Sequence, residues 1–100
     1  MKKYVPSGYQ IIDLGVIEDF ESPISAETDD QKLLCELVND LSQTKPILLK
    51  FNDSNYNVVA LSTRYGNVLF ISYYSSADGE IFHYAISASS NEITFTRVGN

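Results

Sequence analysis

The sequence predicts a small α+β domain in which one helix packs on a mostly antiparallel sheet, in the order β-α-β-β-β-β-β. Only residues 28–42 have apolar side chains at helical spacing. The chain after Pro46 instead alternates short apolar segments with turn residues, which is typical of an antiparallel meander. One hundred residues suffice for a single domain over residues 1–100, and residues 1–8 are expected to form a short N-terminal arm.

The predicted helix has one apolar stripe, which is formed by Leu33, Leu34, Leu37, Val38 and Leu41. Thr28 and Gln31 have the spacing of a capping box, in which each side chain accepts a hydrogen bond from the other residue's backbone N–H. Pro46 cannot donate to a continuing helix and favours an extended residue before it. We therefore expect the helix to begin after Thr28 and to end near Gln43.

The strands are expected on either side of this helix. The first covers residues 9–14 and is expected to end at Gly15, after which an irregular acidic connection, residues 16–27, leads to the helix. Five consecutive strands follow the helix: residues 47–51, 56–63, 68–74, 80–88 and 93–98.

The two central strands are apolar on both faces. In residues 68–74 one side carries Val68, Phe70 and Tyr74 and the other Leu69, Ile71 and Tyr73. In residues 80–88 the two sides carry Ile81, His83 and Ala85, and Phe82, Tyr84 and Ile86. A helix of about 15 residues is only about 22 Å long and covers part of one face. A second covering layer is therefore required, and three sources are open: a sheet that closes on itself, the connection 16–27 folding back, or another subunit. Of these we favour a partner chain.

Tyrosine side chains are concentrated in the meander. Tyrosine is favoured at protein interfaces because it combines a large contact area with a polar tip, although strand propensity alone also enriches it. The candidate interface residues are Tyr65, Leu69, Ile71, Tyr73, Tyr74, Phe82, Tyr84 and Ile86.

Catalytic, metal and cofactor sites are not expected. Cys35 is the only cysteine and lies on the apolar side of the helix, which favours a buried thiol, and His83 is the only histidine, which we expect in the core or at an interface. The glycines are scattered singly at strand ends, so no phosphate-binding loop is indicated. We therefore expect no enzyme activity, and treat a small enzyme that uses Cys35 or His83 as the weakest hypothesis.

Charge and hydropathy restrict the partners and the location. The formal net charge is −6, with no basic cluster beyond Lys2 and Lys3, so nucleic-acid binding is not expected. The N-terminus lacks the apolar segment of a secretory signal, and no run of 18 apolar residues would span a membrane. We expect the protein in a virion or in a host cytoplasm.

Four segments and a meander rich in Tyr, Ser and Thr give the chain a characteristic layout: KKYVPSGYQIIDLG, ETDDQKLLCELVND, KPILLKF and EITFTRV. This layout resembles small accessory proteins of tailed bacteriophages, including head-fibre and capsid-decoration modules. The resemblance implies a non-enzymatic structural or attachment role, typically as a homo-oligomer.

Two functional hypotheses follow. The first is an interaction module that oligomerises through its sheet and helps to build or decorate a phage virion. The alternative is a phage-encoded inhibitor of a host defence complex, in which an acidic surface occupies the basic groove of a nuclease or guide complex.

Overall fold

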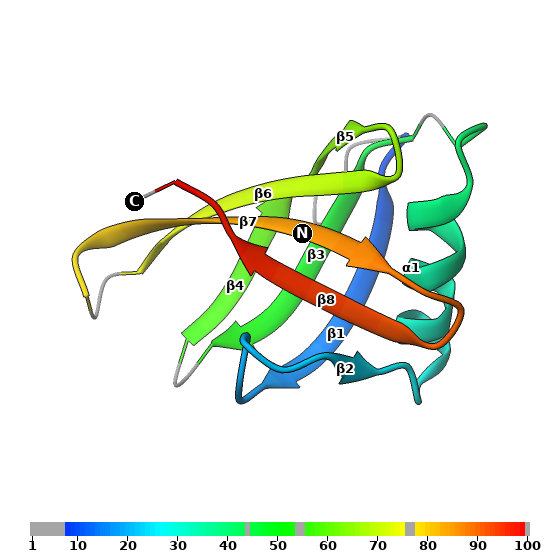
Figure 1. Cartoon of the computed structure of the whole chain (residues 1–100). Helices are drawn as coiled ribbons and strands as arrows, with labels where there is room; N and C mark the ends of the chain where they lie inside the picture. Colours follow the sequence, from blue (N-terminus) through cyan, green and yellow to red (C-terminus); the bar gives the residue numbers. More distant parts are fainter. Residues whose placement is uncertain (1–7, 44, 54–55, 76–77, 100) are drawn as a thin grey trace, which may run out of the picture.

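Two sheets packed against each other form the protein. The computed structural model describes residues 8–43, 45–53, 56–75 and 78–99, so the predicted arm lies almost wholly outside the described residues. Within this part of the chain, one helix and eight strands form a three-stranded and a five-stranded sheet (Figure 1). The predicted class, one helix with mostly antiparallel strands, is confirmed. The predicted order, a single meander after the helix, is wrong.

The three-stranded sheet has the order β1-β3-β4. It contains β1 (Gln10–Ile17), β3 (Ile47–Asp53) and β4 (Tyr56–Leu61). The pairing of β1 with β3 is parallel, and that of β3 with β4 is antiparallel. Gly15 does not end β1 as predicted, because its positive φ of 72° accommodates a register shift between Asp13 and Gly15 and the strand continues.

The five-stranded sheet has the order β2-β8-β7-β6-β5 and is antiparallel throughout. Its strands are β2 (Ile24–Ser25), β5 (Thr63–Tyr65), β6 (Val68–Ser75), β7 (Glu80–Ala88) and β8 (Glu92–Arg97). The predicted strand 56–63 is divided at Ser62, where the chain passes from one sheet to the other. Ser62 is buried, and its hydroxyl accepts the backbone N–H of Ile47 at 3.2 Å, which holds this corner.

The helix α1 (Asp29–Asn39) packs mainly against β1 and β7. Thr28 and Gln31 form the predicted capping box. The helix ends at Asn39 rather than near Gln43, because the Asp40 carboxylate accepts the backbone N–H and the hydroxyl of Ser42, at 3.0 and 2.6 Å. These local bonds offer the chain an alternative to another helical turn.

A single core lies between the sheets and beneath the helix. Its largest fully buried side chains are Ile12, Leu34, Ile47, Leu49, Leu69, Ile86, Ile93 and Val38. Phe20, in the connection before β2, stacks on Tyr84 and meets Phe51 and Phe95 edge to face, with ring centroids 5.0–5.7 Å apart. The inner face of the five-stranded sheet is thus covered by the three-stranded sheet, by α1 and by the connection. The predicted partner chain stays a prediction for the outer face.

Candidate interaction surfaces

The eight predicted interface residues fall into two groups. Five of them are buried in the chain's own core: Leu69, Ile71, Tyr73, Tyr84 and Ile86. Phe82 is half-buried, with the Arg97 guanidinium 4.5 Å from its ring centroid. Tyr65 and Tyr74 are 79% and 64% exposed. Six of the eight predicted interface residues therefore lie on the inner face of the five-stranded sheet. The other two, Tyr65 and Tyr74, lie on its outer face.

The outer face of the five-stranded sheet carries the exposed aromatic side chains. Tyr74 lies directly opposite Ile81 across β6 and β7, and Ile81 is 56% exposed. Phe70, two residues before Ser72 on the same face, is also exposed. Alternation along β6 and β7 was the signal that could have identified Phe70 and Ile81, because both share a face with Tyr74.

Ser72 and His83 form a polar pair at the centre of this outer face. The Ser72 hydroxyl is 2.6 Å from Nδ1 of His83, and the two residues lie opposite each other in the β6–β7 ladder. A histidine that activates a serine nucleophile is usually oriented by a third group. Among the described residues, no carboxylate bonds to His83, so the pair lacks that third group. His83 is exposed on the outer face, so it does not lie in the core, and its place at an interface stays a prediction.

Cys35 is buried on α1, as predicted. Its Sγ atom lies 3.8 Å from the backbone carbonyl oxygen of Glu92. Burial raises the pKa of the Cys35 thiol above its usual range, which lowers the fraction of nucleophilic thiolate. A buried thiol with a raised pKa is typical of a structural cysteine.

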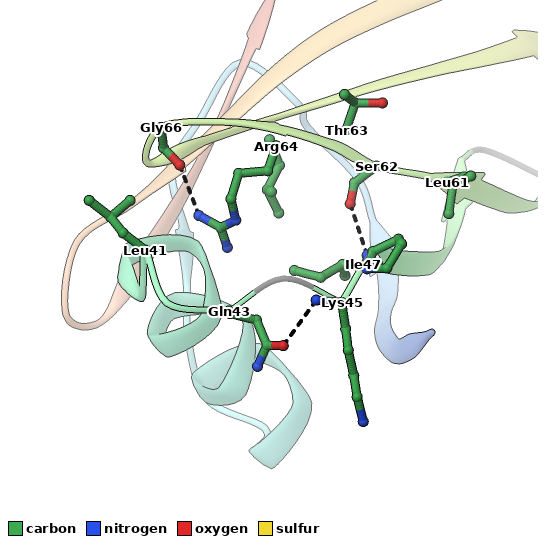
Figure 2. A pocket seen from close by; sticks show the side chains of 11 residues that line it. Leu41, Gln43, Lys45, Ile47, Leu61, Ser62, Thr63, Arg64 and Gly66 are labelled. Atoms are coloured by element: carbon green, nitrogen blue, oxygen red, sulfur yellow. Dashed lines mark hydrogen bonds between the residues drawn. The ribbon is translucent and has the colours of Figure 1, made fainter. Parts of the chain in front are cut away.

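A cleft of about 630 Å³ opens beside the C-terminal end of α1. Figure 2 shows the Arg64 side chain reaching from β5 toward the end of the helix. Its Nη1 atom donates to the carbonyls of Val38 and Gly66, both at 2.9 Å, and Nη2 donates to the carbonyl of Leu37. The charge of Arg64 thus satisfies helix carbonyls and faces the negative end of the helix dipole. Although Arg64 lines the cleft, its role there is structural.

The acidic side chains are concentrated in one part of the chain. Nine of the thirteen acidic residues lie between Asp13 and Asp40, where Lys32 is the only basic residue. This segment forms β1, β2 and α1, which gather on the side of the molecule away from the tip of the β6–β7 hairpin (Figure 1). Hydrogen bonds from Glu21 and Ser22 lower the pKa of Asp19, so this carboxylate stays charged at neutral pH.

Metal ligation has no support in the described residues, where no three His, Cys, Asp or Glu side chains gather in a way that could hold an ion. No helix in the described part of the chain is long and apolar enough to cross a lipid bilayer. In comparisons with protein-family models, curated proteins and solved structures, none matches this chain. The phage relationship therefore stays a prediction.

Proposed function

We propose that this protein is a non-enzymatic interaction module of a phage virion, which self-associates through its sheets and presents an outer sheet face to other proteins of the assembly. The observation that carries the proposal is the exposed group Tyr65, Phe70, Tyr74 and Ile81 on the outer face of the five-stranded sheet. Aromatic and large apolar side chains are enriched where proteins contact one another.

The chemistry of the described residues supports a role in binding rather than in catalysis. The thiol of Cys35 is buried, and Ser72 and His83 lack an orienting carboxylate. The Arg64 guanidinium is engaged by three backbone carbonyls. Arg64 lines the cleft beside α1, but its donors are directed at these carbonyls rather than into the cleft.

Two measurements test the proposal. Sedimentation velocity from about 5 to 500 μM is expected to show a mass that rises with concentration, since a pair held by about 6–7 kcal/mol is partly dissociated in this range. A monomer at every concentration contradicts self-association. Mass spectrometry of purified phage particles is expected to detect the chain, and its presence only in the infected-cell lysate contradicts the virion role.

The acidic segment between Asp13 and Asp40 favours the alternative, an inhibitor whose carboxylates occupy a basic groove of a defence complex. In that case binding to a nuclease or guide complex weakens strongly as salt is raised. Glu36→Gln, on the exposed side of α1, is expected to weaken binding, whereas the control Glu92→Gln, outside the acidic segment, is not. An affinity that does not change with salt concentration contradicts the inhibitor function.

A further inference from the structure

The edges of the two sheets differ in how they are protected. An unpaired edge strand exposes backbone donors and acceptors that can pair with another chain, and proteins commonly shorten, cover or charge such edges. In the five-stranded sheet the edge strands are short, because β2 has two residues and β5 has three, and they pair with only part of β8 and β6. In the three-stranded sheet the edges are β1, with eight residues, and β4, with six.

The outward edge of β1 is occupied by the first turn of α1. The Asp30 carboxylate accepts the backbone N–H of Asp13 at 2.8 Å, and the Gln31 amide donates to the carbonyl of Leu14 at 3.4 Å. Next to them, the Asp13 carboxylate accepts the N–H of Gly15 at 2.9 Å. These side chains satisfy the backbone groups that another strand would need, so β1 is closed to pairing at its centre.

The free backbone groups of β4 follow from its pairing with β3. Ser62 donates its N–H to the carbonyl of Ile47 at 2.8 Å, which makes these two residues a hydrogen-bonded pair in the antiparallel register. Hydrogen-bonded pairs alternate along such a ladder. The backbone groups of Asn57, Val59 and Leu61 therefore point away from β3. Among the described residues, none of these groups bonds to another element, although β6 lies close to β4.

The side chains of β4 add no protection to this edge. The strand reads YNVVAL and contains no charge, proline or glycine. Val59 and Leu61 are 58% and 48% exposed on the outer face of the sheet, where Leu61 lies beside Leu48 and Leu48 beside Ile11. An uncharged strand of high β propensity with a free edge is suited to strand pairing.

Charge distribution permits a second copy to approach at this edge. The acidic segment between Asp13 and Asp40 includes β1 and α1, at the opposite edge of the same sheet. On the outer face beside β4, Val59 has Lys50 as its neighbour on β3, and Lys50 has Asp13 as its neighbour on β1. Two copies that meet through β4 therefore keep their main acidic surfaces apart, which limits the repulsion expected from a net charge of −6.

We propose that β4 pairs antiparallel with β4 of a second copy, about a two-fold axis at Val59, so that two three-stranded sheets become one six-stranded sheet. This inference deepens the proposed self-association and rests on it. Two-fold pairing brings Val59 opposite Val59 of the second copy, and Asn57 opposite Leu61. Because the outward groups are repeated symmetrically, each copy supplies both donors and acceptors to the other.

The matched variants Val59→Lys and Val16→Lys test this assignment. Both replace an exposed valine of the three-stranded sheet, one on each edge strand, and Val16 is 65% exposed. Val59→Lys places two ammonium groups opposite each other at the axis and is expected to raise the dimer dissociation constant at least about tenfold. Val16→Lys is expected to leave it within about twofold, with circular dichroism confirming that both variants fold.

Hydrogen exchange of the unsubstituted protein provides a second readout. The amides of Asn57, Val59 and Leu61 are expected to exchange more slowly as the protein concentration rises, whereas those of Val58 and Ala60, which bond to β3, stay protected at every concentration. The inference is overturned if the dimer survives Val59→Lys, or if exchange at the three outward amides is independent of concentration while dimer forms. In either case self-association itself stands. A protein that stays monomeric at every concentration overturns both the β4 pairing and the proposed self-association.

Discussion

Arg64 provides a sensitive test of how the helix is joined to the five-stranded sheet. Replacing it with methionine keeps much of the aliphatic side chain but removes the donors to Leu37, Val38 and Gly66. It also removes a positive charge from the C-terminal end of α1, whose last turn contains no basic residue of its own. The helix should therefore lose its main attachment to β5.

The magnitude can be estimated from the bonds. A hydrogen bond from a charged donor contributes about 1.5–3 kcal/mol, and a charge beside a helix terminus contributes about 0.3–1 kcal/mol. Arg64 is half-exposed, and water can reach the carbonyls that it releases, so the contributions do not add fully. We expect Arg64→Met to lower the free energy of unfolding by about 2–3 kcal/mol, which corresponds to roughly 10–20 °C in Tm for a domain of this size.

Thermal and urea unfolding followed by circular dichroism measure this loss. Arg64→Lys is expected to recover the charge but not the forked geometry of the guanidinium. Its free energy of unfolding should therefore lie between those of the unsubstituted protein and Arg64→Met. Arg97→Met is the control, because Arg97 is exposed and has two weak contacts: an ion pair with Glu80 at 3.7 Å and a position over the Phe82 ring. Its loss is expected to be about 1 kcal/mol, below that of Arg64→Met. A loss below about 0.5 kcal/mol for Arg64→Met would refute the capping role.

Three further predictions concern the core and the helix. Phe20→Ala removes the ring that joins the connection to three aromatic partners, so unfolding experiments should show a loss of about 2–4 kcal/mol; an unchanged midpoint contradicts this packing. Thr28→Ala breaks the capping box and should cost about 1 kcal/mol, whereas Thr28→Ser should restore most of it. The Cys35 thiol should react with a disulfide reagent far more slowly in the folded protein than in urea, and equal rates contradict its burial.

Local patterns in the sequence were sufficient to predict most of the secondary structure. The start of the helix followed from the Thr28 capping box, and β7 has the predicted bounds. The division into two sheets was not predictable in this way, because Ser62 has no feature that distinguishes a corner from a strand residue. The parallel pairing of β1 with β3 also depends on contacts distant in sequence. Local propensity contains no information about such contacts.

The candidate surface was predicted only in part. Alternation correctly separated the two faces of β6 and β7, but both faces are apolar, so these strands alone did not indicate which one points inward. The neighbouring strand resolves the question: Ile93 and Phe95 of β8 continue the inner face, whereas Thr94 and Thr96 lie on the outer face. Comparing faces across three strands would have indicated which face points into the core of the chain itself.

The one-sided distribution of acidic residues makes the electrostatic potential of the molecule uneven. Nine carboxylates lie between Asp13 and Asp40, whereas the basic and acidic residues of the remaining described chain are equal in number. A protein of this kind rotates as it approaches a cationic surface, so that α1 and β1 arrive first. Immobilisation on an anion exchanger or a cationic sensor chip would therefore orient the molecules uniformly and leave the β6–β7 hairpin directed toward the solution.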